Sequence, residues 1–471
     1  MTYRPTIGLE IHAELKTRTK MFCDCKNDSE EEQPNVNICP VCLAHPGTLP
    51  VPNEAAVEHV LRVGTAIGGT LADYSEFDRK SYFYPDIPKG YQISQSAYPL
   101  VSGGTLARVP VTRIHLEEDT ARSSHEGDAE TSLVDFNRAG VPLMELVTEP
   151  DIHDAQTASR FGRELQLLLR TLGASDANLD KGEMRVEANI SVSATDELGT
   201  KVEVKNLNSF RSVERAIAFE IERQVRVLEE GGTLVQETRG WNESTQETFS
   251  QRVKEGSADY RYFPEPDIPK VMRSETTSWN PEALYAALPE LPEARRSRYE
   301  SLGMKSDDAY YVAGDAERGA FFDAVLALLD DKPQLTLLAT NYFVSDLAGL
   351  ASKGATMLGA VTPEAFASLV RLAEDGTLSS RGAKDVLALL YERGGDAGEV
   401  AKAEGLIQVN DPEALRASVA EVIVEHKAVA DEYRAGKESS LQFLVGQAMK
   451  RTRGAGNPGT IKTLLVEELG K

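Results

Sequence analysis

Apolar and polar residues alternate along several stretches of the first 270 residues. In residues 6–15, TIGLEIHAEL, the odd-numbered positions from 7 onward are apolar, whereas Glu10, His12 and Glu14 occupy even-numbered positions. Alternate side chains of a β-strand point to opposite faces, so this pattern predicts a strand with one apolar face and one face of carboxylate, imidazole and carboxylate groups. Similar alternation predicts strands over 108–119, 182–192 and 200–210.

Helical periods interrupt these strands and replace them after about residue 293. The stretches 157–173 and 209–232 end in glycine, a usual helix stop, and Thr362 is the expected cap of a helix over 362–376. Prolines cluster over 264–293 and indicate a boundary. The predicted class is α+β, with an antiparallel or mixed sheet first and helices afterwards. The expected domains are residues 1–292, a helical domain over 293–398 and a small helical tail over 399–471, with residues 394–400 as a linker.

The composition is that of a globular protein, with 41% hydrophobic and 27% charged residues among 471. The sequence contains no apolar run near the ~18 residues that a membrane span needs and no signal-peptide pattern, so a cytoplasmic location is expected. The net charge of −23 argues against broad nucleic-acid binding, yet residues 401–471 are neutral, with ten Lys/Arg and ten Asp/Glu. Two interpretations stay open: metal binding in the body with a polyanion near the tail, or simple solubility.

All four cysteines lie in one short stretch, as Cys23 and Cys25 followed by Cys39 and Cys42. Disulfides are disfavoured in a reducing compartment, and two close cysteine pairs separated by a loop favour tetrahedral zinc. The sequence therefore predicts a structural zinc site in an insert over about 22–45. His45 is a possible substitute for one ligand, and thiols without metal are the alternative.

The polar faces of the predicted strands repeatedly carry Glu, His or Lys near mid-strand. On the strand over 108–119, alternation places His115, Glu117 and Asp119 on one face and Glu118 on the other. If the sheet curves, such faces form a bowl of carboxylates suited to Mg²⁺ or Mn²⁺ with a nucleotide. The alternative is an ordinary solvated sheet face. The sequence contains neither a Walker-type loop nor a G-x-S-x-G nucleophile motif.

Two further segments have two interpretations each. In residues 77–95, the aromatic residues Tyr82, Phe83, Tyr84 and Tyr91 crowd around Lys80 and Lys89, which suits either a packed loop or a rigid polar passage or interface. Near the C-terminus, Lys450, Arg451 and Arg453 precede a glycine-rich loop. These cations either offset a helix dipole or hold phosphates of a nucleic acid.

Six motifs together resemble one family: IGLEIHAEL, DRKSYFYPDIPKGYQISQ, HLEEDTARS, VDFNRAGVPLMELVTEPD, VKNLNSF and KEGSADYRYFPEPDIP. They are similar to those of the B subunits of bacterial and archaeal glutamyl/aspartyl-tRNA amidotransferases, essentially end to end. The resemblance implies a cradle-shaped, kinase-like domain, a helical domain and a small helical tail. From the neutral charge of the tail and its cluster of cations, we expect the tail to bind tRNA. It implies that ATP with Mg²⁺ activates the side-chain carboxylate of Glu-tRNA(Gln) or Asp-tRNA(Asn). Ammonia from an amidase (A) subunit then displaces the phosphate, and a small C subunit braces the assembly.

By position, the resemblance implies that His12, Glu118 and Glu203 hold the catalytic Mg²⁺. It also implies neighbouring carboxylates around a second metal and two lysines along the ammonia path. The neighbours are Glu10, Glu117, Glu145 and Glu187, and the lysines are Lys80 and Lys89. The expected role of Glu118 conflicts with strand alternation unless the strand bulges there.

Two other functions remain as alternatives to amidation. One is a scaffold that handles tRNA without chemistry, and the other is a metal-dependent phosphohydrolase. A scaffold cleaves no ATP and a hydrolase ignores the tRNA, so ATP cleavage that depends on charged tRNA separates all three.

Overall fold

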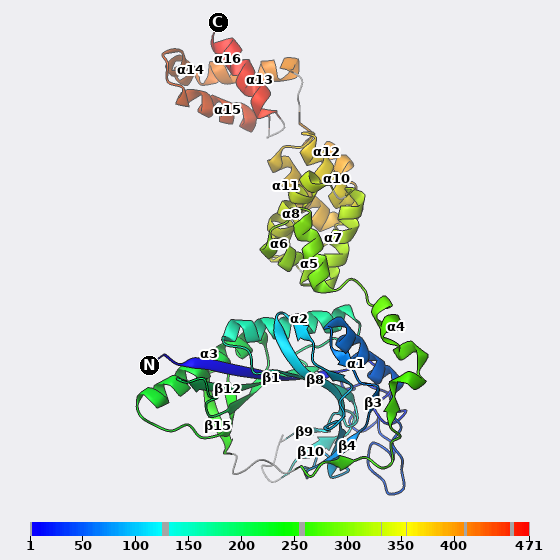
Figure 1. The fold of residues 1–471 in the computed structure, drawn as a ribbon. Helices are drawn as coiled ribbons and strands as arrows, with labels where there is room; N and C mark the ends of the chain where they lie inside the picture. Colours follow the sequence, from blue (N-terminus) through cyan, green and yellow to red (C-terminus); the bar gives the residue numbers. More distant parts are fainter. Residues whose placement is uncertain are drawn as a thin grey trace. The chain divides into compact units, whose positions relative to one another are not determined.

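The computed structural model describes residues 2–124, 131–253, 260–330, 332–354, 356–408, 412–452 and 456–470. The chain divides into two compact units, Met1–Leu291 and Pro292–Lys471 (Figure 1). The first unit combines a large mixed sheet with helices, and the described part of the second is helical. The predicted α+β class is confirmed, whereas a kinase-like cradle stays a prediction.

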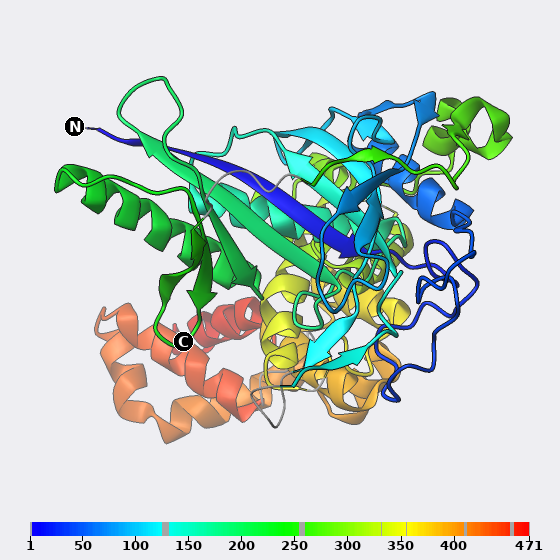
Figure 2. The same ribbon diagram turned by 90° about the horizontal axis from the view of Figure 1, so that it is seen from below.

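A ten-stranded sheet forms the centre of the first unit, and β1 (Arg4–Glu14) lies inside it between β12 and β11 (Figure 2). Both neighbours pair with β1 in antiparallel fashion, and the parallel pair β13–β14 makes the sheet mixed. Across the sheet the order is β15 (Glu247–Val253), β14 (Glu237–Asn242), β13 (Val202–Leu207), β12 (Met184–Ser193), β1, β11 (Pro142–Thr148), β8 (Val109–Glu118), β6 (Val101–Ser102) and β2 (Thr70–Leu71), with β7 (Thr105–Leu106) paired to β8.

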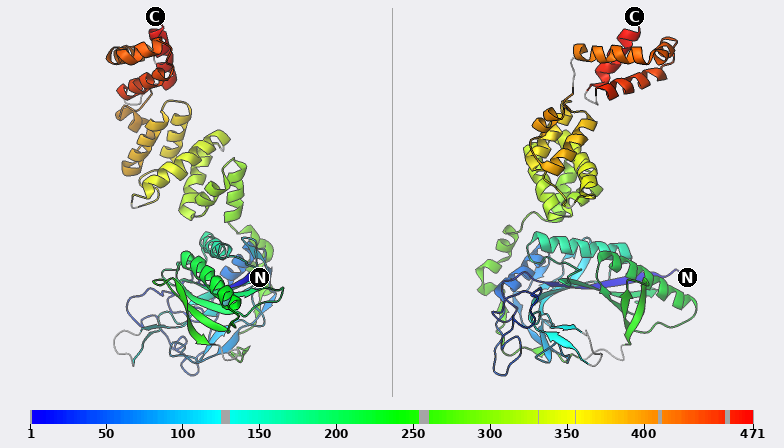
Figure 3. Two further views of the ribbon diagram at one scale, coloured as in Figure 1. Left: turned by 90° about the vertical axis from the view of Figure 1, so that its left-hand side faces the viewer. Right: turned by 180° about the vertical axis from the view of Figure 1, so that it is seen from behind.

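Alternation along β1 decides which face of the sheet is apolar. Its residues from Ile7 to Leu15 at odd positions are at most 2% exposed and belong to the core of the first unit. Helices α2 (Ala155–Thr171) and α3 (Phe210–Glu229) lie side by side over this face (Figure 3). The opposite, polar face of β1 is therefore left for a site.

The starts of both covering helices follow from local capping. The Asp154 side chain accepts a hydrogen bond from the backbone N–H of Thr157, and the Ser209 hydroxyl accepts one from that of Ser212. Such caps satisfy N–H groups that the first helical turn leaves unpaired. Strands predicted over 108–119, 182–192 and 200–210 are confirmed as β8, β12 and β13, with ends that differ by a few residues.

Smaller elements close the first unit. Of three short sheets, two join segments that are far apart in sequence, and the longest remaining helix is α1 (Glu54–Ala66). The short sheets pair β3 (Tyr74–Ser75) with β17 (Val271–Met272), β9 (Arg122–Ser124) with β10 (Leu133–Asp135), and β4 (Asp78–Ser81) with β5 (Tyr91–Ser94) and β16 (Phe263–Pro264); the unit ends with two short 3₁₀ turns, Arg273–Glu275 and Thr277–Trp279, and α4 (Pro281–Ala286).

The second unit contains two hydrophobic clusters, one formed by residues from Tyr299 to Ala401 and one by residues from Leu415 to Leu469. Around the first cluster are α5 (Pro292–Ser301), α6 (Ser306–Ala313), α7 (Ala316–Leu328), α8 (Pro333–Asn341), a π-helical turn (Tyr342–Leu347), α9 (Ala348–Ala351), α10 (Pro363–Glu374), α11 (Ser380–Arg393) and α12 (Ala397–Ala403). Around the second are α13 (Pro412–Glu425), α14 (Lys427–Arg434), α15 (Ser439–Arg451) and α16 (Pro458–Leu469).

The predicted linker over 394–400 is wrong in its second half, because α12 begins at Ala397. Asp396 caps this helix by accepting a hydrogen bond from the backbone N–H of Glu399, and Ala397 and Ala401 are buried in the first cluster. The expected edge between residues 398 and 399 falls inside α12. Among the described helices, none combines the length and the apolar character that a bilayer crossing requires.

Candidate active site

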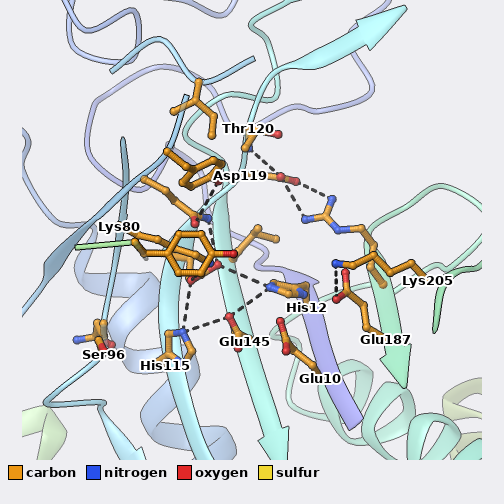
Figure 4. Close-up of a pocket in the computed structure, with 18 of the residues that line it drawn as sticks. Glu10, His12, Lys80, Ser96, His115, Asp119, Thr120, Glu145, Glu187 and Lys205 are labelled. Atoms are coloured by element: carbon orange, nitrogen blue, oxygen red, sulfur yellow. Dashed lines mark hydrogen bonds and ion pairs between the residues drawn. The ribbon is translucent and has the colours of Figure 1, made fainter. Parts of the chain in front are cut away.

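The polar sides of neighbouring strands line a cavity of about 740 Å³ in the first unit, here called the polar cavity (Figure 4). β1, β11 and β8 supply its centre, and β12 and β13 supply one end. Tyr82, Tyr260 and Tyr262 also line it. Its charged lining residues are Glu10, His12, Lys80, Asp86, Arg113, His115, Glu117, Asp119, Arg138, Glu145, Arg185, Glu187, Lys201, Glu203 and Lys205.

Two histidines and two glutamates form the centre of the cavity. Strand register places His12 opposite Glu145 and Glu145 opposite His115, so these three lie in one row across β1, β11 and β8. Oε2 of Glu145 lies 3.3 Å from Nε2 of both imidazoles. Glu117 completes the group, with carboxylate oxygens 3.6 Å from His12 and 3.5 Å from His115. Each imidazole therefore contacts the same two carboxylates.

The opposite charges of the two histidines and two glutamates stabilise one another. Burial on its own lowers the pKa of an imidazole, but contacts with Glu117 and Glu145 outweigh it and raise the pKa of His12 to about 10 and that of His115 to about 9. Burial on its own raises the pKa of Glu145, but the charge of His115 and contacts with both imidazoles lower it to about 2. Without a bound cation, the centre therefore holds carboxylates paired with protonated imidazoles.

Two sets of side chains in the polar cavity have the spacing of metal ligands. Glu10, His12 and Glu145 offer atoms within 4.8 Å of one another, and so do His115, Glu117 and Glu145. Burial and then the charges of Glu145 and Glu187 raise the pKa of Glu10, so a cation beside it would relieve an unfavourable negative charge. Carboxylate oxygens with few imidazoles suit Mg²⁺ or Mn²⁺.

Cationic side chains surround this acidic centre. Nζ of Lys80 lies 3.9 Å from a Glu117 oxygen. Burial on its own lowers the pKa of Lys80, but the charge of Glu117 leads a group of effects that raise it. Nζ of Lys205 lies 2.7 Å from Glu187 and 3.6 Å from Glu203. The cavity thus has carboxylates for a divalent cation and fixed positive charges for phosphate groups.

Glu118 does not lie in the polar cavity, which corrects its expected place beside His12 and Glu203. Its carboxylate points to the other face of β8, where it accepts hydrogen bonds from Nζ of Lys89 at 2.6 Å and from the backbone N–H of Ile93 at 3.0 Å. The register of β8 on β11 is regular from Arg113 to Glu118, so no bulge reorients the side chain. Strand alternation, rather than the family resemblance, predicted the correct face.

The other predicted acidic residues line the polar cavity. Glu203 accepts a hydrogen bond from the hydroxyl of Thr238 at 2.7 Å, near Lys205 and Glu187, and it is absent from both sets with ligand spacing. Ligand roles for His12, Glu10 and Glu145 stay predictions.

Sequence reasoning missed several residues of the cavity. The guanidinium of Arg185 donates two hydrogen bonds to Asp119 at 3.0 and 3.1 Å, and Nε of Arg138 lies 3.6 Å from the same carboxylate. Strand alternation places His115 on the correct face but indicates no role for it. The alternation from His115 through Asp119 was the sequence signal that places Asp119 on the cavity face. Arg138 lies in a loop, and no periodic pattern predicts where a loop side chain points.

The four cysteines come together as predicted, with all four sulfur atoms within 4.8 Å of one another. Tetrahedral zinc–thiolate sites have Zn–S distances of ~2.3 Å, which place sulfur atoms about 3.8 Å apart. The observed 4.0 Å between the Cys25 and Cys42 sulfurs fits that size. His45 lies near but does not belong to the set. This group, here called the cysteine cluster, has the geometry for zinc, and the identity of the metal stays a prediction.

Two smaller cavities lie between the polar cavity and the cysteine cluster, because neighbouring spaces share lining residues. A space of about 10 Å³ shares Gln92 and Asp119 with the polar cavity. A second space, of about 260 Å³, shares Lys89, Glu118 and Gly140 with the first and is also lined by cysteines of the cluster. We call these two spaces the passage. Of the two lysines predicted along an ammonia path, Lys89 lies in the passage and Lys80 in the polar cavity.

The predicted cations of the tail have unequal surroundings. Lys450 is exposed at the end of α15. Arg451 donates hydrogen bonds to Glu421 at 2.7 Å and to Glu425 at 3.1 Å, so it is partly neutralised. Arg453 lies outside the described residues. A tRNA-binding role for this group stays a prediction.

Comparisons with known proteins cover most of the chain. Residues 5–278 match the family described as the GatB/GatE catalytic domain, and residues 320–469 match the one described as the GatB domain. The chain is 46% identical over 476 residues to the B subunit of the aspartyl/glutamyl-tRNA(Asn/Gln) amidotransferase of Thermus thermophilus, covering 99% of both chains. It is 43% identical over 488 residues to the protein of the same name from Synechocystis, covering 98% of this chain and 97% of the relative.

A moss relative extends the comparison to an organelle. The chain is 43% identical over 488 residues to the B subunit of the chloroplastic/mitochondrial glutamyl-tRNA(Gln) amidotransferase of Physcomitrium patens, covering 99% of this chain and 85% of the relative. The matched domains and these full-length identities show that the chain belongs to the GatB family of tRNA-dependent amidotransferase B subunits.

Proposed function

We propose that the polar cavity activates the side-chain carboxylate of glutamate on tRNA(Gln), or of aspartate on tRNA(Asn), with ATP, and then converts it to an amide. The observation that carries this proposal is the His12–Glu145–His115 row, flanked by Glu117 and by Lys80, in one cavity. Such a site has ligands for a cation and counter-charges for phosphates, which are the main needs of phosphoryl transfer. The cavity would be the reaction centre of a kinase-like cradle.

The reaction has two balanced steps. First, a carboxylate oxygen of the aminoacyl group bonds to the γ-phosphorus of ATP, and ADP leaves. Then ammonia bonds to the acyl carbon, the bond from this carbon to the phosphorylated oxygen breaks, phosphate leaves, and one proton is released. Phosphate replaces an oxide that is too poor a leaving group, so no covalent enzyme nucleophile is required.

Magnesium ions, where bound, would neutralise the phosphate charge. Glu10, His12 and Glu145 are the proposed ligands of one ion, and His115 and Glu117 with a shared Glu145 are those of a second. The hydroxyl of Ser94 and the side-chain N–H of Gln92 hold Glu117 in place with hydrogen bonds of 2.6 and 3.0 Å. Lys80, Arg185 and Lys205 would bind phosphate oxygens, while Glu187 and Glu203 orient Lys205.

Ammonia would reach the polar cavity through the passage, from glutamine hydrolysed by a partner A subunit, with a small C subunit bracing the complex. Lys89 and Glu118 form an ion pair and line both spaces of the passage, of which the smaller has a volume of about 10 Å³. This placement gives Glu118 a new role, in ammonia transfer instead of metal binding. The zinc of the cysteine cluster would be structural, because a closed set of four thiolates leaves no open position for a substrate.

The opposite faces of β8 provide the test, because Glu117 and Glu118 are adjacent and chemically identical. In the assembled complex, Glu117→Gln should abolish ATP cleavage with charged tRNA, whether glutamine or ammonium chloride supplies nitrogen. Glu118→Gln should retain ATP cleavage and ammonium-supported amide formation. The assay measures ADP and Gln-tRNA or Asn-tRNA in parallel. ATP cleavage without charged tRNA would instead indicate a phosphohydrolase, and tRNA binding without cleavage in the parent complex would indicate a scaffold.

A further inference from the structure

A fully buried lysine lies beside the cysteine cluster. The side chain of Lys20 is 0% exposed, and its ammonium donates hydrogen bonds to the carbonyl oxygens of Asn37 at 2.7 Å and Phe136 at 3.1 Å. It also lies 4.0 Å from the sulfur of Cys42. Lys20 therefore contacts the cluster, the insert that carries it, and the segment just before β11.

The cysteine cluster explains why a charged group is buried here. A buried ammonium whose partners are all neutral is costly. Four thiolates around one Zn²⁺ sum to a formal charge of about −2, which gives Lys20 a counter-charge. Groups that neutralise or hydrogen-bond metal ligands in this way commonly tune metal affinity. Lys20 and a zinc ion bound by the four cysteines would thus stabilise each other.

A strap of hydrogen bonds joins the insert to the segment over 134–137. The side-chain oxygen of Asn137, a fully buried residue, accepts from the backbone N–H groups of Val36 and Asn37, each at 2.9 Å. Its amide donates to the carbonyl of Gln33 at 2.8 Å. In the other direction, the backbone N–H of Phe136 donates to the side chain of Asn35 at 2.7 Å. Lys20 bridges the strap at the end nearest the metal ligands.

Three residues after the segment over 134–137, Gly140 forms part of the wall of the passage. Gly140 lines both of its spaces and has φ of +84°, a conformation that favours glycine. Its carbonyl accepts from the backbone N–H of Met21 at 2.7 Å, and its N–H donates to the carbonyl of Asp119 at 2.9 Å. A Cβ built on Gly140 would lie 3.6 Å from the Lys20 side chain and 3.7 Å from Cβ of Cys42. Lys20 and the cysteine cluster thus pack against this part of the wall.

We propose that Lys20 is a positioning residue that transmits the metal state of the cysteine cluster to the wall of the passage. Metal loading then determines how completely released ammonia is converted into amide. This inference rests on the proposed function, because it assumes that ammonia uses the passage. It assigns no chemistry to the cluster, and it predicts a loss of coupling rather than a loss of the reaction.

The test compares Lys20→Met with Lys26→Met in the assembled complex. Lys26 belongs to the same insert, but its side chain is 66% exposed and pairs with Asp28. In Lys20→Met, zinc affinity should fall by about 10–100-fold. Hydrogen exchange of the amides of Val36 and Asn37 should speed up by about tenfold or more. Glutamate released per amide formed should rise by about fivefold, at the lower end of usual coupling between sites. Lys26→Met should match the parent in all three measurements.

Ammonium chloride separates coupling from chemistry. With saturating ammonium, Lys20→Met should form amide at a rate within about twofold of the parent, because the polar cavity is unchanged. An unchanged ratio of glutamate to amide, with zinc lost and exchange accelerated, would overturn the inference and leave the cluster as a purely structural site. An equal loss with both nitrogen sources would overturn it too, because the defect would then lie in the reaction centre.

Removing the metal from the parent complex with a chelator gives a second, reversible route that avoids a folding defect. The ratio of glutamate to amide should rise on chelation and return when zinc is added back. A constant ratio through this cycle would refute the inference. A different result would refute the proposed function, namely a parent complex that makes no amide from charged tRNA with either nitrogen source. In that case, hydrogen exchange would still report whether Lys20 stabilises the strap.

Discussion

Breaking the buried Lys89–Glu118 pair tests the revised role of Glu118. The side chains of these residues are 14% and 6% exposed, and their charged atoms lie 2.6 Å apart. At an effective dielectric constant of about 20, Coulomb attraction at this distance is ~6 kcal/mol, and desolvation of both ions cancels much of it. Lys89→Met leaves Glu118 with the N–H of Ile93 as its remaining partner among those described above, so we expect a cost of about 2–4 kcal/mol.

A double-mutant cycle turns this estimate into a measurement. Glu118→Gln alone should cost less, about 1–2 kcal/mol, because the amide still accepts from Ile93. The double variant should be more stable than the sum of the single effects by about 1–3 kcal/mol. Urea unfolding followed by tryptophan fluorescence reports on the first unit, because both tryptophans of the chain, Trp241 and Trp279, are buried there. A coupling energy below about 0.5 kcal/mol would refute the reasoning, since it is typical of exposed pairs.

Three further predictions concern metals and the tail. Purified protein should contain about one zinc per chain, and replacing the two cysteines 39 and 42 with serine should remove it; four titratable thiols in metal-free parent protein would contradict this. Because the pKa of His12 is raised to about 10, this imidazole is protonated at pH 8, so Mg²⁺ that binds through it should release close to one proton and bind more tightly as pH rises. Calorimetry in two buffers of different ionisation enthalpy measures that release, and none would exclude His12 as a ligand. In the tail, Lys450→Ala should reduce the log–log slope of tRNA affinity against salt concentration by roughly 0.7–0.9, with kcat at saturation unchanged. Arg451→Ala should reduce this slope less, because Glu421 and Glu425 already neutralise Arg451. Equal slopes for the parent and Lys450→Ala would refute the tRNA interpretation.

Periodicity predicted the parts of the site that lie on strands. The alternation in β1 correctly separated the apolar core face from Glu10 and His12, and the same rule placed Glu117 and Glu118 on opposite faces. The family resemblance identified the segment of β8 that reaches the polar cavity, but it named Glu118, whereas Glu117 is the residue that lines this cavity. On a strand, a shift of one residue moves a side chain to the opposite face, here from the polar cavity to the passage.

The sequence pattern did not predict contacts between segments that are distant in the chain. Register across three strands brings His115 to Glu145 and His12, and no local period encodes which strands become neighbours. Lys20 gives no signal at all, because its burial depends on carbonyl oxygens 17 and 116 residues away in the chain. The cysteine spacing predicted its own cluster, since both ligand pairs are local, but it gave no sign of what the cluster supports.

The central position of β1 has a consequence for biosynthesis. This strand is translated before both of its partners, β11, which begins at Pro142, and β12, which begins at Met184. At ~5–20 residues per second, the apolar face of β1 waits on the order of 10 seconds or more before either edge can be paired. An unpaired strand with an apolar face is a template for aggregation. The nascent chain is therefore most prone to aggregate before the residues of β12 have been synthesised.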